Sequence, residues 1–468
     1  MLSLWGEKVH VSRSIALWLV VFLQVLDLLL YSPQRVVAQE NQNAMVEEQA
    51  RPSFTFQELA DEVKEGFSYV FASYLFGNTQ KPSDSTQNPN NDFLKIPRYT
   101  ADIELRPDFF LDFRRLKLMV KPRLTLEWDR WEDGSKEGDT KTDSDFLVNE
   151  WLVRLRLVEG LFGSYGRENL QWGPSYFLSP SNPFFRDNGL ANPTREVPGS
   201  DFVRFVWVPA PSLGFSFIAN VDEGLQEYIS EDFERTYALK ADYTTYRKYF
   251  SLIPSYRESD RGHLGAYAGW TVSDAWLLYG ESALSRGTNG LYPVEDSTAP
   301  LGIKMSKTKD DDNSLEGILL LGGSYTLEAG PTFTLEYVYN SEGYDDDEAD
   351  LYYDLRERAS EIFYSPEPAS SLSRSVLSQT LDPRLRLLRN HYLFLQYQHS
   401  QIWNVLNIIF RYAYNLDDNS SQLNPIVEYA IGDNTRLFLV GRQNFGSDET
   451  EFGSIIDYFW SLGLVYTF

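Results

Sequence analysis

Cysteine is absent from the 468-residue chain, and its absence excludes a disulfide framework, thiolate metal sites and a cysteine nucleophile. The absence also suits a chain that crosses an oxidising periplasm unfolded, where free thiols would be a hazard. Beyond the first 40 residues the sequence also lacks any apolar run of about 20 residues, the length that a transmembrane helix needs. A bundle of membrane-spanning helices is therefore excluded.

Positive charge and histidine are scarce as well. The chain carries 42 Lys and Arg against 67 Asp and Glu, a formal net charge of −25, so it is a poor candidate for binding nucleic acid. It has four histidines and neither a G-x-S-x-G nor an H-E-x-x-H motif. The acidic runs at 309–312 and 345–348 lack the spacing of a calcium loop. We therefore expect no catalytic residues, no metal site and no cofactor.

The N-terminal residues 1–38 have the layout of a secretory signal peptide. Lys8 and Arg13 precede an apolar run, and Ala38 supplies a small residue at the expected cleavage site. The alternative is a single membrane-anchoring helix, but Asp27 interrupts the apolar run. We therefore expect the mature chain to begin just after Ala38.

Aromatic residues are abundant, with 29 Tyr, 30 Phe and 11 Trp, and they are spread through short segments in which apolar and polar residues alternate. The clearest segments are 101–113 and 115–129, in which a period of two predicts strands with one apolar and one charged face. Strands of soluble sandwiches average only about 5 to 6 residues. Longer strands suit an inclined crossing of a bilayer, with lipid against the apolar face and water against the charged face.

The joins between the expected strands alternate between long and short. Long joins fall, for example, at 78–98, 174–200 and 341–389, whereas short joins consist of only a few residues. Bacterial outer-membrane barrels have this pattern, with short periplasmic turns and long extracellular loops. We predict an all-β, antiparallel transmembrane β-barrel of about 18 strands over residues 66–468. The first strand lacks polar alternation, so 16 strands is the alternative.

Two helices are expected outside the strands. Residues 39–65 are predicted to form a periplasmic N-terminal segment with a short helix, because Phe56, Leu59 and Val63 share one helical face. The loop 341–389 contains a second helical stretch with the same kind of apolar face.

The C-terminal segment has an apolar face that ends on an aromatic residue. This face consists of Tyr458, Trp460, Leu462, Leu464, Tyr466 and Phe468. It resembles the C-terminal strand signal of Gram-negative outer-membrane proteins. The resemblance implies that Tyr466 and Phe468 are recognised by the barrel assembly machinery, and that the mature protein is surrounded by outer-membrane lipid and lipopolysaccharide.

Charged residues are predicted to line the inside of the barrel. The predicted pore-lining set is Arg115, Lys117, Lys121, Arg123, Arg154, Arg156, Asp102, Glu104 and Asp108. The strand that carries Arg154 and Arg156 is expected to place Leu147, Trp151 and Val153 on its lipid side. Two interpretations remain open: a salt-bridge ladder that fills the lumen, or a transverse field that selects solutes, which resembles the basic ladder of general porins.

The long join at 174–200 is rich in Pro, Asn and Gly but also carries several aromatic residues, so we expect it to fold into the lumen. It is the third long loop, and in this it resembles the constriction loop of porins. The predicted constriction residues are Trp172, Tyr176, Phe177, Arg186 and Arg195. Trp172-Gly173-Pro174 followed by Leu178-Ser179 also resembles outer-membrane barrels of capsule or exopolysaccharide assembly and export.

The sequence therefore favours a porin-like outer-membrane channel for small hydrophilic solutes. The first alternative is a barrel that binds or exports surface polysaccharide, with Trp172, Tyr176 and Phe177 stacking on sugar rings. The second alternative is an outer-membrane hydrolase that uses His263, the one histidine expected near the outer rim of the lumen. The transported solute and the oligomeric state stay open.

Overall fold

The structure is a computed structural model that describes residues 56–185, 188–190, 192, 194–226, 233–258, 262–306 and 314–468. The expected signal peptide, most of the segment 39–65, Arg186 and the acidic run 309–312 lie outside the described residues. Residues Gln57–Phe468 form one compact unit. No helix among the described residues is long and apolar enough to span a membrane.

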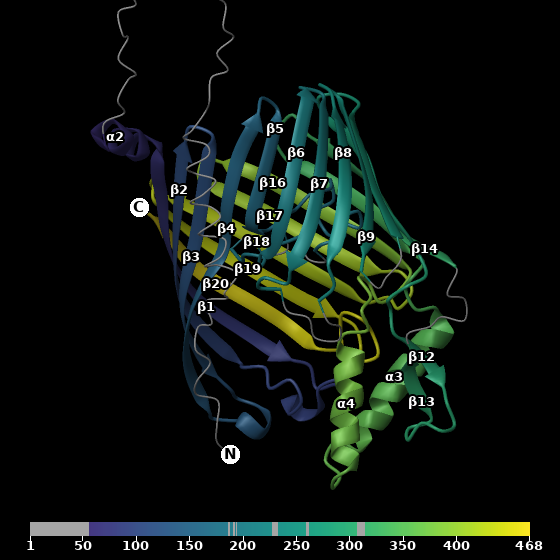
Figure 1. The fold of residues 1–468 in the computed structure, drawn as a ribbon. Helices are drawn as coiled ribbons and strands as arrows, with labels where there is room; N and C mark the ends of the chain where they lie inside the picture. Colours follow the sequence, from purple (N-terminus) through teal and green to yellow (C-terminus); the bar gives the residue numbers. More distant parts are fainter. Residues whose placement is uncertain are drawn as a thin grey trace, which may run out of the picture. The chain divides into compact units, whose positions relative to one another are not determined.

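Eighteen antiparallel strands form one closed barrel (Figure 1), as predicted. They are β1 (Phe67–Pro82), β2 (Tyr99–Phe113), β3 (Leu116–Arg130), β4 (Thr140–Val158), β5 (Leu161–Glu168), β6 (Ser200–Ala210), β7 (Leu213–Asp222), β8 (Thr236–Thr244), β9 (Lys248–Arg257), β10 (Gly262–Thr271), β11 (Trp276–Arg286), β14 (Leu315–Thr326), β15 (Thr332–Asn340), β16 (His391–Ile402), β17 (Leu406–Asn415), β18 (Ser421–Ile431), β19 (Thr435–Phe445) and β20 (Ile456–Thr467). The first and last strands pair with each other and close the sheet, with Ala72 opposite Thr467.

The first strand is part of the barrel although its sequence lacks polar alternation. The inward-facing Tyr74 and Phe76 pack against an apolar cluster that contains Phe438 and Val465. This part of the inner wall is apolar, so both faces of β1 carry apolar residues. The alternative of 16 strands is therefore wrong.

The direction of the side chains on β3 agrees with the predicted alternation. Leu124, Leu126 and Trp128 are exposed on the outer surface, whereas Arg123 and Asp129 are buried on the inner side. An apolar outer surface and a polar inner wall are the arrangement that a bilayer around a water-filled barrel requires.

The predicted direction of Leu147 on β4 is wrong because a β-bulge shifts the strand register. Lys121 pairs with Glu150 but Pro122 pairs with Val148, so one residue of β4 is skipped. Beyond the bulge, Leu147 lies opposite the inward-facing Arg123. Phe146, which is 68% exposed, takes the outer side in its place. A single inserted residue reverses every later side chain of a strand.

The two ends of the barrel differ, as the join lengths predicted. One end, here called the outer end, carries η1 (Pro89–Asn91), η2 (Gly134–Lys136), the hairpin β12 (Tyr292–Glu295) and β13 (Ile303–Ser306), and the helices α3 (Asp346–Glu361) and α4 (Ala369–Leu381) (Figure 1). Asp345 caps α3, accepting a hydrogen bond from the Glu348 backbone N–H in a capping box. The other end carries short turns and the predicted helix α2 (Phe56–Gly66), which is tied to the β2–β3 turn by an Arg114–Glu62 ion pair of 2.8 Å.

Glu451 joins several segments at the outer end. Its carboxyl group accepts hydrogen bonds from the Tyr392 hydroxyl at 2.6 Å, the Leu388 N–H at 3.1 Å and the Asn415 side chain at 2.9 Å. Burial raises the pKa of Glu451 from its ordinary value of 4.5 to about 7, and the nearby Asp418 carboxylate adds to the increase.

We expect the outer end to lose stability as pH rises through 7. When folding raises the pKa of a carboxyl group, the folded state favours the protonated form of that group. The resulting stabilisation is fully present below the ordinary pKa and is lost as the pH rises through the raised pKa. It amounts to about 1.4 kcal/mol for each unit of the pKa shift. Limited proteolysis within residues 341–389 should therefore be slower at pH 5 than at pH 8. Glu451→Gln should remove most of this difference, and a wild-type protein cleaved equally fast at both pH values would contradict the prediction.

Candidate functional site

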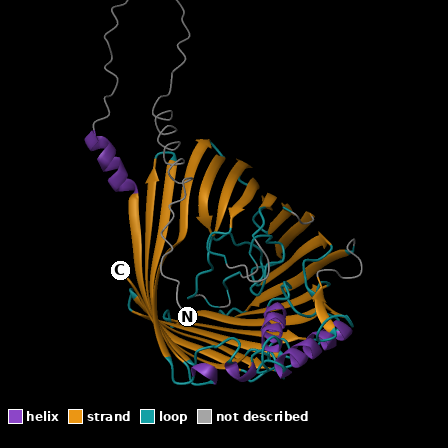
Figure 2. Ribbon diagram, turned by 60° about the horizontal axis from the view of Figure 1, so that its bottom comes forward, coloured by secondary structure: helices purple, strands orange, loops and turns teal. Residues whose placement is uncertain are grey.

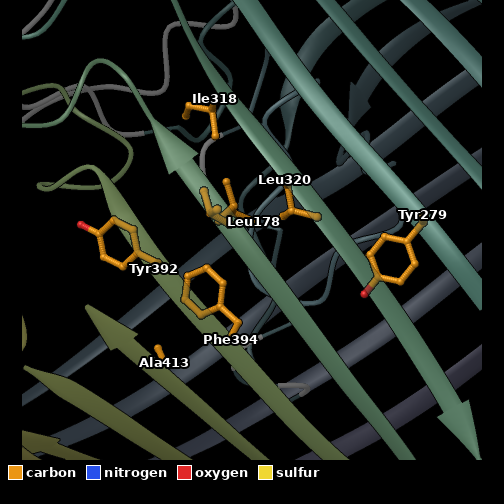
Figure 3. Packing of buried hydrophobic residues seen from close by; sticks show 8 residues of the cluster. Leu178, Tyr279, Ile318, Leu320, Tyr392, Phe394 and Ala413 are labelled. Atoms are coloured by element: carbon orange, nitrogen blue, oxygen red, sulfur yellow. The ribbon is translucent and has the colours of Figure 1, made fainter. Parts of the chain in front are cut away.

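The join between β5 and β6, residues 169–199, runs into the interior of the barrel (Figure 2) and is called here the pore loop. Leu178 of this loop packs into a buried cluster on the inner wall that includes Tyr279, Leu320 and Phe394 (Figure 3). The ring of Phe177 stacks on Phe394, with 4.3 Å between the ring centroids. Phe177 and Leu178 are thus packed against the wall, as the aromatic content of the loop predicted.

Two buried carboxylates of the wall bind the first half of the pore loop. Glu336 on β15 accepts hydrogen bonds from the Ser175 hydroxyl at 2.8 Å and the Tyr176 N–H at 3.2 Å. Glu281 on β11 accepts hydrogen bonds from the Ser179 hydroxyl at 2.6 Å and from the Ser181 hydroxyl at 2.7 Å. Burying a carboxylate is costly unless hydrogen bonds replace its hydration. The loop therefore stabilises the charges in the wall, and these charges hold the loop.

Gly173 allows the loop to approach Glu281 closely. A Cβ atom at this position would lie 2.4 Å from Glu281 Oε2, and the residue has a φ of +95°, which other residues rarely adopt. A side chain here would therefore displace the loop from the carboxylate.

Two arginines bind backbone carbonyl groups of the pore loop. Arg386, from the segment after α4, donates to the carbonyl oxygens of Ser179, at 2.7 Å, and Asn182. Arg411 on β17 donates to the carbonyl oxygen of Leu190 and to the side chain of Gln396. Charged donors make stronger hydrogen bonds than neutral ones, so these contacts add to the attachment of the loop.

The second half of the pore loop is bound to the opposite side of the barrel. Arg123 on β3 forms a bidentate ion pair with Glu196 of the loop, with N–O distances of 2.6 and 2.8 Å, and also contacts Asp108 at 2.9 Å. Arg106 on β2 donates to the Thr194 carbonyl oxygen at 2.8 Å. The loop is therefore attached to the wall on both sides.

Most of the predicted wall residues have a charged or polar side-chain partner in the structure. Lys121 pairs with Glu150 at 2.7 Å, and Arg154 contacts Glu168 at 3.7 Å. Glu104 pairs with Arg106, and Asp102 accepts a hydrogen bond from the Asn78 side chain. Arg156 donates a hydrogen bond to the Arg114 carbonyl oxygen. Lys117 is exposed and lies opposite Arg154 on the neighbouring strand. Arg115, expected on the wall, instead lies in the turn between β2 and β3, because the hairpin turns at Arg114 and Arg115.

The predicted constriction residues have different surroundings. The Trp172 ring lies edge-on to Phe184, with 5.9 Å between the centroids, and the Lys240 ammonium lies 5.7 Å from the Trp172 centroid. Tyr176 is held through its N–H by Glu336, and Arg195 is exposed on the second half of the loop. Arg186 lies outside the described residues.

Several residues that hold the loop were not predicted from the sequence: Glu281, Glu336, Arg386, Arg411, Arg106 and Glu196. Glu281 and Glu336 each follow the alternation of their strand, and each is an acidic residue in a segment that is otherwise apolar or small. An isolated acidic residue on the inner face of such a strand is the sequence signal for these two positions, and it does not show that the pore loop is their partner.

The three described histidines lie where the alternation placed them. His391 and His399 occupy opposite ends of β16. His263 lies at the start of β10, and its Nδ1 atom is 3.2 Å from the Ser255 hydroxyl on β9.

The comparisons with known proteins show a shared fold. No family model matches the sequence, and no curated protein sequence matches it. Among solved structures, the chain is similar to OccK5 (OpdH) of Pseudomonas aeruginosa, with a TM-score of 0.51 and 11% identity over 86% of this chain and 98% of that chain. It is similar to OccK7 (OpdD) of the same bacterium, with a TM-score of 0.50 and 12% identity over 86% and 98%. A third similar structure is the outer membrane protein OprD from Pseudomonas aeruginosa, with a TM-score of 0.47 and 12% identity over 86% and 94%.

Proposed function

We propose that the chain is a porin-like channel in the outer membrane of a Gram-negative bacterium, through which small hydrophilic solutes pass. The observation that carries the proposal is the pore loop, which is attached to both sides of an 18-stranded barrel. Side chains fill a barrel of about eight strands, whereas barrels of 16 to 18 strands leave an aqueous channel. An inward loop in a barrel of this size narrows the channel.

The ion pairs of the wall support a role in positioning the pore loop. Arg123 contacts two carboxylates, and Lys121 and Arg154 each contact one. Paired charges give a weaker net field than a bare row of cations. We therefore infer a modest ion preference for the channel, rather than the strong anion preference of an uncompensated basic ladder.

The packing of the pore-loop aromatics favours the channel over the polysaccharide-binding alternative. Phe177 stacks on Phe394, and Trp172 packs against Phe184. Rings that pack against protein have less area for stacking on a sugar. The fold shared with OccK5 and OccK7 agrees with the channel proposal but does not identify a solute.

Single-channel recording tests the proposed function directly. The full-length mature protein, inserted into a planar bilayer, should produce stepwise ion currents. A correctly folded barrel that produces no current would overturn the proposal and favour a closed barrel with a structural or binding role.

A further inference from the structure

We propose that the outer end of the barrel carries a binding site for an acidic saccharide, separate from the channel. An open cavity of about 710 Å³ lies between the η1–η2 region on one side and the segment that joins α3 to α4, with the first part of α4, on the other. It is lined by Asp92, Phe93, Lys95, Ser135, Phe363, Tyr364, Ser365, Ser370 and Arg374. Small-ligand sites typically have volumes of about 300 to 1,000 Å³.

The two sides of this cavity are joined by contacts between distant parts of the chain. The Tyr364 hydroxyl donates to Asp92 Oδ2 at 2.7 Å, and the Phe93 and Phe363 rings meet edge-to-face with centroids 6.4 Å apart. Asp92 Oδ1 accepts a hydrogen bond from the Ser135 N–H. The cavity is therefore built from three separate joins that hold one another in place.

The chemistry of the lining fits a sugar. Tyr364 is 64% exposed although its hydroxyl is engaged, so its ring is accessible to the apolar face of a pyranose. Ser135 and Ser365 add hydroxyl groups that can exchange hydrogen bonds with sugar hydroxyls. An aromatic face beside polar donors and acceptors is the combination that an amphipathic sugar ring requires.

The cations of the lining indicate that the sugar is acidic. Both oxygens of Asp92, the one carboxylate of the lining, already accept hydrogen bonds from Tyr364 and Ser135. Lys95 is exposed. Arg374 lies 5.6 Å from the centroid of the Phe363 ring and makes a long ionic contact of 3.9 Å to Glu367, with both charged side chains more than half exposed. An exposed ion pair of this kind contributes little, so a ligand carboxylate can replace Glu367 on the guanidinium at low cost.

Calorimetric titration of the full-length protein in detergent tests the site, with tri-galacturonic acid as the acidic probe and maltotriose as a neutral probe. The wild-type protein should bind the acidic trisaccharide at least about tenfold more tightly than maltotriose, because charged partners strengthen hydrogen bonds. Arg374→Gln with Lys95→Gln should abolish this preference, whereas Tyr364→Ala should weaken the binding of both probes. The same loss after Lys141→Gln, an exposed cation outside the cavity, would show a nonspecific charge effect and overturn the proposal.

Two further measurements separate this site from the channel. Tyr364→Phe keeps the ring but loses the hydrogen bond to Asp92, so it should bind better than Tyr364→Ala. The Arg374→Gln variant should keep the single-channel conductance of the wild type, which also shows that it folds. Undetectable binding of tri-galacturonic acid at about 10 mM, or equal affinity for the two probes, would overturn the acidic-saccharide site while leaving the channel proposal intact.

Discussion

Replacing residues 175–197 of the pore loop with a short Gly-Ser linker is expected to raise the single-channel conductance by about two- to fivefold. The loop contacts the inner wall from β2 and β3 on one side to β11, β15 and β17 on the other. If the loop forms the proposed constriction, its removal should widen the water-filled path. The wall carboxylates Glu281 and Glu336 would then be hydrated by lumenal water, so the loss of their loop partners should not prevent folding.

The matched control for this deletion is a shortening of the β12–β13 hairpin at the outer end, which should leave the conductance near that of the wild type. The loop deletion itself should keep the heat-modifiable gel mobility of a folded barrel. If the deleted variant folds and conducts as the wild type does, the path of the ions does not pass the pore loop, and the constriction assigned to it is wrong.

The attachment of the loop should also be visible without deleting it. Glu281→Ala with Glu336→Ala leaves the Ser175 and Ser181 hydroxyls without their carboxylate acceptors, and the Ser179 hydroxyl keeps the Trp172 carbonyl oxygen at 2.8 Å. Each lost hydrogen bond to a charged group is worth about 1.5 to 3 kcal/mol, so the loop should leave the wall part of the time. We expect open-channel current noise to increase severalfold, with Glu428→Ala on the inner wall of β18 as a control. Unchanged noise would show that the other contacts of the loop, such as the packing of Leu178 and the hydrogen bonds from Arg386, hold it without these two carboxylates.

The inward course of the pore loop could be predicted from the sequence, whereas its partners could not. The loop is long, and residues such as Phe177 and Phe184 are costly to leave in water, so a packed position followed from composition. The partners Glu281 and Glu336 lie 100 or more residues further along the chain. Closure of the barrel brings these two residues close to the loop. A local sequence pattern cannot predict this contact, because it depends on how distant strands are arranged around the barrel.

Strand number and facing were predictable for a related reason. Period-two alternation is local, and the join lengths record which end of the barrel the chain has reached. The errors occurred where one residue changes the outcome: the skipped Asn149 reversed the direction of Leu147, and the position of the β2–β3 turn removed Arg115 from the wall. In β1, Tyr74 and Phe76 face an apolar part of the inner wall, so alternation was weak although the strand is present.

Leu124→Arg is expected to prevent most of the protein from folding into membranes, whereas Thr125→Arg should be tolerated. Leu124 is 39% exposed on the outer surface and pairs with Leu105 and with Phe146, which is 68% exposed. An arginine there would face hydrocarbon, at a cost of about 2 to 4 kcal/mol near the bilayer midplane. That cost lowers the folding equilibrium constant by a factor of about 30 to 1,000.

Residue 125 is adjacent to residue 124 on β3, but its side chain lies on the opposite face of the strand. Thr125 lies opposite Glu104 on β2 and Asp145 on β4, so an arginine there would face the polar interior near two carboxylates. The folded fraction of each variant can be measured by heat-modifiable gel mobility after refolding into lipid vesicles. Because the two variants place the same cation on consecutive residues of one strand, a large difference between them reports which face meets lipid. Equal folding of both variants would mean that β3 does not face a bilayer, and the membrane barrel itself would then be in error.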